Sequence, residues 1–424
     1  MEISPAQAVA FRLAAHGLAP RGDGGDPLAP LASWALQDSP PGTAAVALAA
    51  RSQALDAGAL DTALHDERSA VALYNPRTAT AIVPAAEVVA YTRALRPAGA
   101  DADGWRAVLG PRVLPDAGEL AEPAAALDAA LPAFAAALDG AELSRDDLHA
   151  ELRERLPQPL LPWCDGCQSH HARRGLLVAA GLHGLLCIAG RAGRQPLFAR
   201  TDQWLASAPS AWASSAAGAW ASSAAGAGDG ASDAGDGDTS GAGPVDGDSA
   251  AADLVRRYLR WYGPSTPALF APWAGITPSQ ARAAWALVET ELAEVGIASD
   301  DGSARPRRAW LLADDVQALA DAEPQAGAIL LAPGDPLLLA RDRELLLPDP
   351  AQRRRAFAAI NGPGVVLLDG AAAALWRGRK RGRTLEVAVE PLAERPLSRR
   401  ALSAIEREAV RLAPHRGCSG AALA

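Results

Sequence analysis

The spacing of apolar side chains between residues 254 and 315 predicts three helices followed by two strands. The third helix carries apolar residues at the helical period on one face, at Ala281, Ala284, Trp285 and Val288. It is expected to begin at Thr277, where Thr-Pro-Ser-Gln forms a capping box with proline at the first helical position. The strand-like runs are Leu292–Ala298 and Arg308–Leu312. This is the order of a winged helix, in which the capped helix enters the major groove.

A winged helix that reads DNA would use polar residues at the start of its capped helix and cations on its hairpin. The candidates are Thr277, Ser279, Gln280 and Arg282 on the helix, and Arg307 and Arg308 on the hairpin. The alternative is a winged helix that serves only as a scaffold or as a protein-contact surface.

Similar orders of elements recur upstream. A predicted hairpin at Ala70–Tyr74 and Thr78–Val83 precedes a helix, and the predicted helix His171–Leu182 precedes strands at Leu185–Ala189 and Pro196–Arg200. One winged-helix architecture is therefore predicted to occur at least twice and up to three times. Residues 207–252 contain the sequence AWASSAAG twice and then a Gly/Asp/Ser tract, which predicts a disordered linker.

From Ala328 onward the apolar period is that of strands, including runs at Leu337–Leu339 and Glu344–Leu347. The expected fold class is α+β, with tandem winged-helix domains and a C-terminal small β-barrel or curled sheet. The expected domains are an N-terminal winged-helix region (1–105), a second winged helix (106–206), the linker (207–252), a third winged helix (253–326) and the barrel with a closing helix (327–424).

Composition and the N-terminal sequence indicate in which cellular compartment the protein is expected. Apolar runs are shorter than the roughly 20 residues of a membrane span, and the sequence MEISPAQAVAF lacks the pattern of a signal peptide. Four cysteines in 424 residues do not form a disulfide framework. A cytoplasmic, nucleoid-associated monomer without membrane contact is expected. The net charge of −9 includes six aspartates between residues 229 and 248, so it neither supports nor excludes DNA binding.

The densest group of cations lies between two predicted strands near the C-terminus. Its members are Arg377, Arg379, Lys380, Arg381 and Arg383. On a hairpin these side chains would project together toward solvent and could neutralise several phosphates, which gives salt-dependent, sequence-independent affinity. The alternative is a solvated turn without a partner.

Four potential metal ligands fall within eight residues, at Cys164, Cys167, His170 and His171. The Cys-x-x-Cys spacing fits a zinc knuckle to which the histidines would add the remaining ligands. The alternative is a pair of reduced cysteines packed beside the start of a helix, with no cofactor.

Three polar residues, Gln37, Asp38 and Ser39, lie between two short apolar helices and could form a small site. Equally, Asp38 and Ser39 are ordinary turn and cap residues.

Several stretches together resemble the AlkZ/YcaQ-type DNA glycosylases and their winged-helix relatives. They are Trp34–Pro40 with the helix ending at Arg51, Arg257–Pro267, Trp273–Arg282, Asp335–Arg343 and the Trp376 hairpin. The resemblance implies tandem winged helices and a β-barrel around a DNA channel. For the glycosylases among them it implies hydrolysis of the N-glycosidic bond of alkylated bases without a metal.

The chain departs from the family's catalytic pattern at two positions. The family motif Gln-x-Gln or Gln-x-Asp begins at Gln37 and has Ser39 as its third residue, and a hydroxyl is a weak general base. The Arg-x-x-x-His segment falls on Arg77 and places Ala81 at the histidine position. We therefore interpret the chain as a duplex-DNA-binding relative with reduced, redirected or absent glycosylase activity, in which Gln37 acts with Asp38 or Ser39 and Arg77 contacts DNA. The alternative is a transcription regulator without a catalytic loop.

Overall fold

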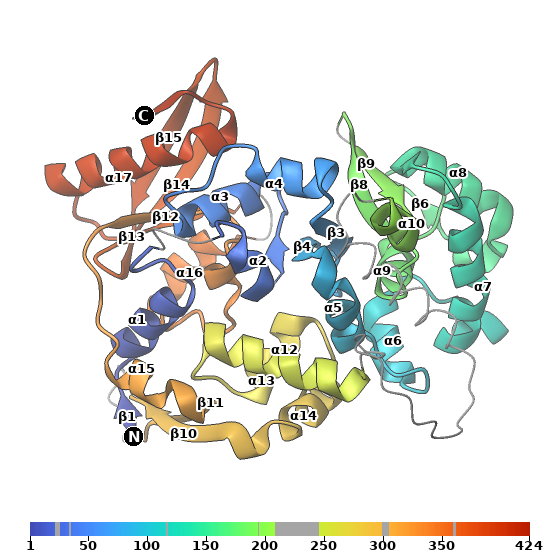
Figure 1. Cartoon of the computed structure of the whole chain (residues 1–424), viewed down its shortest axis with the longest axis horizontal. Coiled ribbons are helices and arrows are strands. Elements are labelled where there is room, and N and C mark those ends of the chain that lie inside the picture. Colours follow the sequence, from blue (N-terminus) through green and yellow to red (C-terminus); the bar gives the residue numbers. More distant parts are fainter. Residues whose placement is uncertain are drawn as a thin grey trace. The chain divides into compact units, whose positions relative to one another are not determined.

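The computed structural model describes residues 1–21, 26–33, 35–115, 118–193, 195–207, 246–298, 305–358 and 362–424. The chain divides into two compact units. Unit 1 comprises Met1–Leu60, Val255–Trp273 and Val288–Ala424, and unit 2 comprises Asp61–Leu254 and Ala274–Leu287. Helices and sheets occur in both units, which makes the fold α+β as predicted (Figure 1). Within the described ranges, no helix has the length and apolar character needed to cross a bilayer.

Unit 1 contains two sheets with helices packed around them. Its helices, of which α12 begins in unit 2 and α13 ends there, are α1 (Pro5–Ala15), α2 (Ala29–Ser33), α3 (Thr43–Arg51), α12 (Gly247–Tyr262), α13 (Pro267–Ala274), α15 (Val316–Ala320), α16 (Pro350–Ala356) and α17 (Arg399–Leu412). The smaller sheet consists of β1 (Glu2–Ile3), β10 (Leu292–Ile297) and β11 (Arg307–Leu312). The predicted β10–β11 hairpin is present, and β1 adds a parallel strand with Glu2 opposite Gly296.

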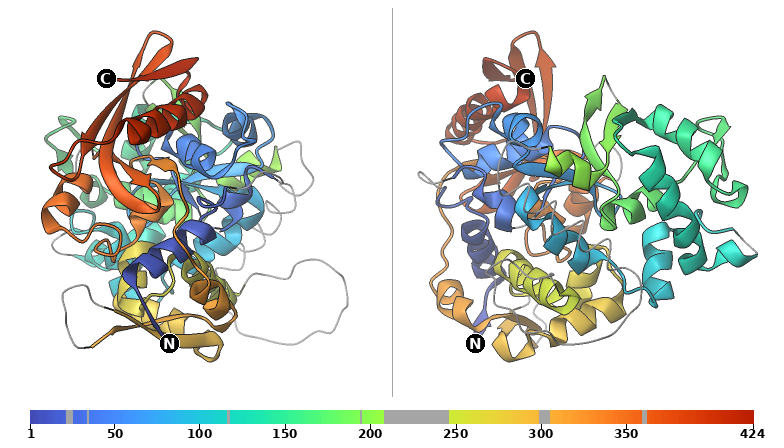
Figure 2. Two further views of the ribbon diagram at one scale, coloured as in Figure 1. Left: turned by 90° about the vertical axis from the view of Figure 1, so that its left-hand side faces the viewer. Right: turned by 45° about the vertical axis from the view of Figure 1, so that its right-hand side comes forward.

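The larger sheet of unit 1 has five strands in chain order. They are β12 (Ala328–Leu331), β13 (Gly364–Leu368), β14 (Ala371–Arg381), β15 (Thr384–Pro391) and β16 (Gly420–Leu423). Neighbours are antiparallel except β15 and β16, and α17 packs along the sheet (Figure 2). Among the described strands, β12 and β16 are the two edges, so the sheet is an open half-barrel, which corresponds to the curled sheet of the two predicted alternatives.

Two of the strands predicted in this region are absent from the described residues. Residues Pro336–Leu339 form a 3-10 helix because Asp335 caps them, its side chain accepting from the Leu337 amide at 3.0 Å. Residues 343–346 form a turn. The apolar side chains of Leu337 and Leu347 still enter the core beneath the sheet. The spacing of these apolar residues therefore reflects their burial in the core and not pairing with a neighbouring strand.

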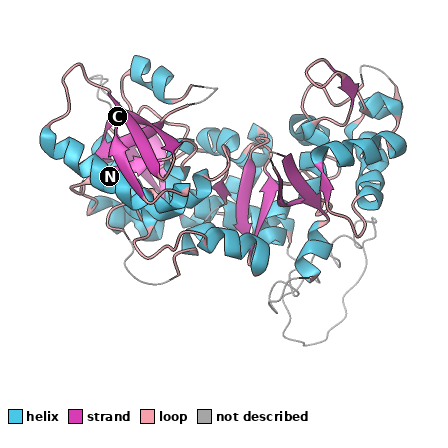
Figure 3. Cartoon of the chain, turned by 90° about the horizontal axis from the view of Figure 1, so that it is seen from above, coloured by secondary structure: helices cyan, strands magenta, loops and turns pink. Residues whose placement is uncertain are grey.

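Unit 2 is built around one sheet that joins hairpins predicted to belong to separate winged helices. Its main strands are β3 (Ala70–Tyr74), β4 (Thr80–Pro84), β5 (Leu143–Ser144), β8 (Cys187–Ala192) and β9 (Gln195–Ala199), in the order β4-β3-β8-β9-β5. The pair Ala72 and Ile188 connects the two hairpins. The predicted wings are therefore not independent of each other. The strands are drawn in magenta in Figure 3.

Helices of unit 2 pack against this sheet, and the unit also contains a small separate hairpin. The helices are α5 (Val88–Leu95), α6 (Ala102–Leu109), α7 (Pro123–Ala137), α8 (Arg145–Arg155), α9 (Arg174–Leu182), α10 (Thr201–Ala206) and α14 (Pro278–Ala286), and the short α4 (Ala59–Asp61) lies where the two units meet in the sequence. Among those that pack against the sheet are α5, α8, α9 and α10. The small hairpin is β6 (Trp163–Cys164) and β7 (Ser169–His170).

The predicted linker at 207–252 lies largely outside the described residues, since 208–245 are not among them. Its last part is helical, because α12 begins at Gly247. The Asp246 side chain accepts from the Ser249 amide at 3.2 Å and so starts this helix. Downstream, Leu254 and Val255 are buried. From α12 to β11 the elements follow the predicted order of three helices and a hairpin.

Candidate functional site

The polar loop Gln37–Ser39 connects the short strand β2 (Leu36–Gln37) to α3. Leu36 is buried, Gln37 is half-buried and Ser39 is exposed. The Gln37 Nε2 donates to the Ser39 carbonyl at 3.3 Å and faces the turn at Gly334. A Cβ on Gly334 would lie 3.0 Å from this nitrogen, and the residue has a φ of +77°, so both space and backbone favour glycine. The Gln37 amide is thus held beside a tight turn.

The Asp38 carboxylate turns away from this arrangement and caps α3. Its Oδ1 accepts from the amide of Gly42 at 2.7 Å and from that of Ala44 at 3.1 Å. The residue at the N-cap position, Gly42, has no side chain with which to cap the helix. The turn-and-cap interpretation of Asp38 therefore describes its geometry.

The C-terminal end of α3 is fixed by a buried ion pair. Arg51 contacts Asp335 through both oxygens, at 2.8 and 2.9 Å, and the two side chains are 1% and 0% exposed. Arg51 Nη2 also donates to His16 Nδ1 at 3.2 Å, and His16 Nε2 donates to the Trp261 carbonyl at 3.1 Å. Burial, with Arg51 and Arg12 nearby, lowers the pKa of His16 well below its ordinary value. A neutral histidine thus accepts from a charged arginine.

Two further arginines bind the last carbonyls of α3. Arg21 Nε donates to the Ala50 carbonyl at 2.9 Å, and Arg411 donates to the Ala49 carbonyl. Both guanidinium groups also pair with Glu408, which Arg21 contacts at 2.7 Å. Cations at the C-terminal end of a helix complement its dipole. The helix that follows the Gln37 loop is therefore held at both ends.

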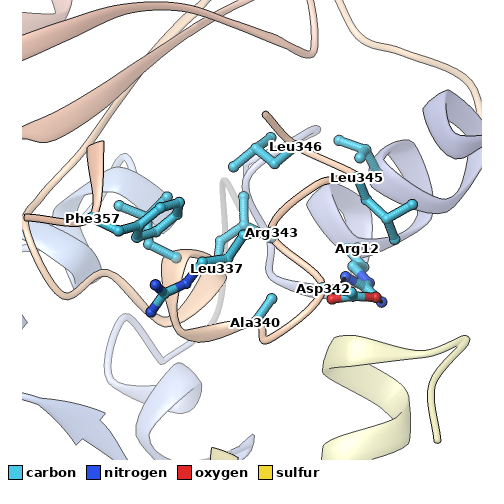
Figure 4. A pocket seen from close by; sticks show the side chains of 10 residues that line it. Arg12, Leu337, Ala340, Asp342, Arg343, Leu345, Leu346 and Phe357 are labelled. Atoms are coloured by element: carbon cyan, nitrogen blue, oxygen red, sulfur yellow. Dashed lines mark hydrogen bonds and ion pairs between the residues drawn. The ribbon is translucent and has the colours of Figure 1, made fainter. Parts of the chain in front are cut away.

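A second buried pair, Arg12 and Asp342, lies at the rim of a small apolar pocket in unit 1 (Figure 4). Arg12 also donates to the carbonyls of Gly263 at 3.2 Å and Pro264 at 3.1 Å. Leu345, Leu346 and Phe357 are among the apolar residues that line the pocket, and Gln37 is not one of them. The pocket therefore belongs to the supporting structure and not to the polar loop.

The sequence motifs assign no site role to five buried supporting residues, namely Arg12, His16, Arg51, Asp335 and Asp342. A signal was present for Arg12, His16 and Asp335, because each is a charged or polar residue within an otherwise apolar run. Charged residues are rarely buried without a partner.

The predicted groove contacts at the start of α14 are partly occupied by capping. Thr277 and Gln280 form the predicted capping box: the Thr277 amide donates to Gln280 Oε1 at 3.0 Å, and the Gln280 amide donates to Thr277 Oγ1 at 3.3 Å. Ser279 and Arg282 are exposed. Of the four predicted contacts, these two have side chains that face solvent.

The predicted contacts on the β10–β11 hairpin are engaged in ion pairs. Arg308 pairs with Glu294 on the opposite strand, at 2.8 Å from its Nε. Arg307 pairs with Glu344 at 2.9 Å and with Asp342 at 3.3 Å. A phosphate would have to compete with these carboxylates.

Arg77 lies in the turn between β3 and β4, where its side-chain stem approaches the turn at Gly275. Asn75 stabilises the turn by accepting from the Ala79 amide at 3.1 Å. Ala81 is buried in β4 opposite Leu73. The position where the resemblance expects a histidine is therefore part of the apolar core.

The basic stretch forms the predicted hairpin, but strand alternation divides its cations. Arg377, Arg379 and Arg381 are exposed on one face of β14, whereas Lys380 points to the other face, toward Gly417. Arg381 pairs with Glu386 across the hairpin at 3.3 Å. Among the described residues, no carboxylate forms an ion pair with Arg379, Lys380 or Arg383. The prediction that all five cations project together is thus wrong, although several remain open to an anion.

Three of the four predicted metal ligands come together in unit 2. The ligand atoms of Cys164, Cys167 and His171 all lie within 4.8 Å of one another. His170 is not part of this group, because its ring donates to the Leu161 carbonyl at 2.7 Å.

Comparisons with known proteins give two findings. The model of a family described as DNA glycosylase AlkZ-like matches residues 32–415. Among solved structures, the DNA glycosylase AlkZ of Streptomyces sahachiroi is similar with a TM-score of 0.66 and 22% sequence identity, over 100% of both chains. Identity this low shows a common fold. A comparison with curated proteins gave no significant match.

Proposed function

Because this chain belongs to the AlkZ-like DNA glycosylase family, we propose that it binds duplex DNA and removes alkylated bases through the Gln37 loop. The observation that carries the chemical part of this proposal is the geometry of Asp38. Its carboxylate caps α3, which leaves the half-buried Gln37 amide and the exposed Ser39 hydroxyl as the other polar side-chain groups of the loop.

An amide and a hydroxyl can orient a water molecule but accept its proton poorly. Hydrolysis at such a loop therefore depends on a nucleobase that is a good leaving group. A purine alkylated on a ring nitrogen carries a positive charge, which is neutralised as the glycosidic bond breaks, so its departure needs no added proton. We propose cationic alkylated bases as the substrate class and expect neutral bases to remain uncleaved.

DNA would be held mainly by the β14–β15 hairpin, whose Arg379, Lys380 and Arg383 have no acidic partner among the described residues. Ser279 and Arg282 at the start of α14 would supply groove contacts, because capping leaves their side chains exposed.

The test is incubation with a duplex that contains one N7-methylguanine, scored by the formation of abasic sites. Gln37→Ala is expected to slow the reaction by about 100-fold or more, the usual cost of removing one aligned hydrogen-bonding group. Asp38→Asn is the matched control, because asparagine caps a helix as well as aspartate does. Its rate should stay within about threefold of the unmodified protein.

Two outcomes would contradict parts of the proposal. Loss of cleavage in Asp38→Asn with binding intact would make Asp38 the general base. Tight binding of the duplex without any cleavage by the unmodified protein would instead support a regulator that lacks glycosylase activity.

A further inference from the structure

The cluster of Cys164, Cys167 and His171 has the chemistry and the geometry of a metal site. Two thiolates bound to one tetrahedral zinc are about 3.8 Å apart when each Zn–S distance is about 2.3 Å. The ligand atoms of the cluster already lie within 4.8 Å of one another. A contraction of about 1 Å would therefore suffice for all three to bind one ion.

The His171 ring is prepared for coordination. Its Nδ1 donates to the Ala172 carbonyl at 2.8 Å, which fixes the tautomer with an unprotonated Nε2. This Nε2 is buried and has no hydrogen-bond partner among the described residues, and the residue is 8% exposed. A metal-bound histidine commonly donates its other ring nitrogen to a carbonyl in this way. A buried nitrogen without a partner otherwise carries a desolvation cost.

The backbone around the two cysteines forms a tight knuckle. The Cys167 amide donates to the Cys164 carbonyl at 3.2 Å, and Gln168 follows with a left-handed φ of 52°. Strands β6 and β7 contain two residues each, and Trp163 at their start is 46% exposed. A two-stranded hairpin of this size has little apolar burial of its own.

We propose that Cys164, Cys167 and His171 bind one zinc ion, with water at the fourth position. The exposed side of Cys167 gives that water access. His170 is not a ligand, since its Nδ1 donates to the Leu161 carbonyl and its ring meets the Trp163 ring edge-on at 5.3 Å. The ion would stabilise the β6–β7 hairpin, which lies between α8 and α9 in the sequence. It has no part in the proposed cleavage reaction at Gln37.

The test uses the full chain, treated with chelator and kept reduced with a phosphine, and then titrated with cobalt(II) as a spectroscopic substitute for zinc. Unmodified protein is expected to bind one equivalent, with visible d–d bands and near-ultraviolet thiolate-to-cobalt charge transfer. Zinc should displace the cobalt and raise the melting temperature. Cys164→Ser and His171→Gln are expected to weaken zinc binding by at least 10-fold.

His170→Gln is the matched control, since it alters the adjacent histidine, and it should bind cobalt like the unmodified protein. Far-ultraviolet circular dichroism verifies that each variant is folded. Absence of charge transfer in the reduced, folded protein would overturn the proposal, as would undiminished binding by His171→Gln. Rapid formation of a Cys164–Cys167 disulfide that zinc does not suppress would also count against it.

Discussion

Arginine has opposite roles at the end of α3 and on the β14–β15 hairpin. Around α3, Arg21 and Arg51 point inward and contact carboxylates that are largely buried. On the hairpin, Arg379 and Arg383 point outward and have no acidic partner among the described residues. The first group holds the chain together, whereas the second remains able to bind an external anion.

The difference shows that a count of cations does not locate a phosphate-binding surface. The β10–β11 hairpin is also basic in sequence, yet Arg307 and Arg308 are neutralised by Glu344 and Glu294. Whether a basic hairpin can bind phosphate depends on whether acidic residues lie across the hairpin or beneath it and neutralise its arginines. Three expected outcomes test the comparison.

The largest effect is expected at the buried pair. Arg51→Ala leaves the Asp335 carboxylate buried without a counter-ion and should lower the free energy of unfolding by about 3–5 kcal/mol. Urea denaturation followed by circular dichroism measures the change. Arg308→Ala removes an exposed pair as a control and should cost about 0–1 kcal/mol. Equal losses of unfolding free energy in the two variants would show that buried and exposed arginines contribute equally to stability.

A smaller effect, on DNA affinity instead of stability, is expected at the hairpin. The triple variant Arg379→Ala, Lys380→Ala, Arg383→Ala should bind duplex DNA about 10- to 100-fold more weakly at near-physiological salt. The slope of log affinity against log salt should become less negative by about 2 to 3. Fluorescence anisotropy at several salt concentrations measures both quantities.

The control for the hairpin is again Arg308→Ala, whose affinity should stay within about threefold of the unmodified protein because Glu294 already neutralises the arginine. If Arg308→Ala weakened DNA binding as much as the single variant Arg379→Ala, ion pairing would not explain why the two hairpins differ in their contribution to DNA affinity.

The smallest effect concerns pH. Burial lowers the pKa of His16 well below its ordinary value and that of His183 to about 4. The unfolded chain binds protons at these histidines below about pH 6.5, whereas the folded chain does not until the pH is lower. Stability present above pH 6.5 should therefore fall as the pH drops toward 4. His16→Gln should make this dependence shallower in urea denaturation, and an unchanged slope would contradict a neutral buried His16.

Local signals in the sequence predict some features of this protein and not others. The α14 cap depends on Thr277 and Gln280, three residues apart, and the β14–β15 hairpin depends on strands adjacent in sequence. Such features can be predicted because the interacting residues are neighbours. The pairing of Ala72 with Ile188 cannot, since alternation shows that a strand is buried but not which strand lies beside it.

The same limit applies to the candidate site. Gln37 and Ser39 could be selected from the sequence, but the direction of the Asp38 carboxylate follows from the backbone of the turn before α3. The pairing of Arg51 with Asp335 depends on the assembled fold of unit 1.

Arg51 and Asp335 are 284 positions apart, which has a consequence for synthesis of the protein on the ribosome. At about 5–20 residues per second, roughly 15 to 60 seconds pass between translation of the arginine and translation of its partner. During that interval α3 lacks its buried counter-ion, so the preceding loop acquires its final support only late in synthesis. Ribosomes halted before Asp335 should therefore carry an N-terminal segment that proteases cleave readily.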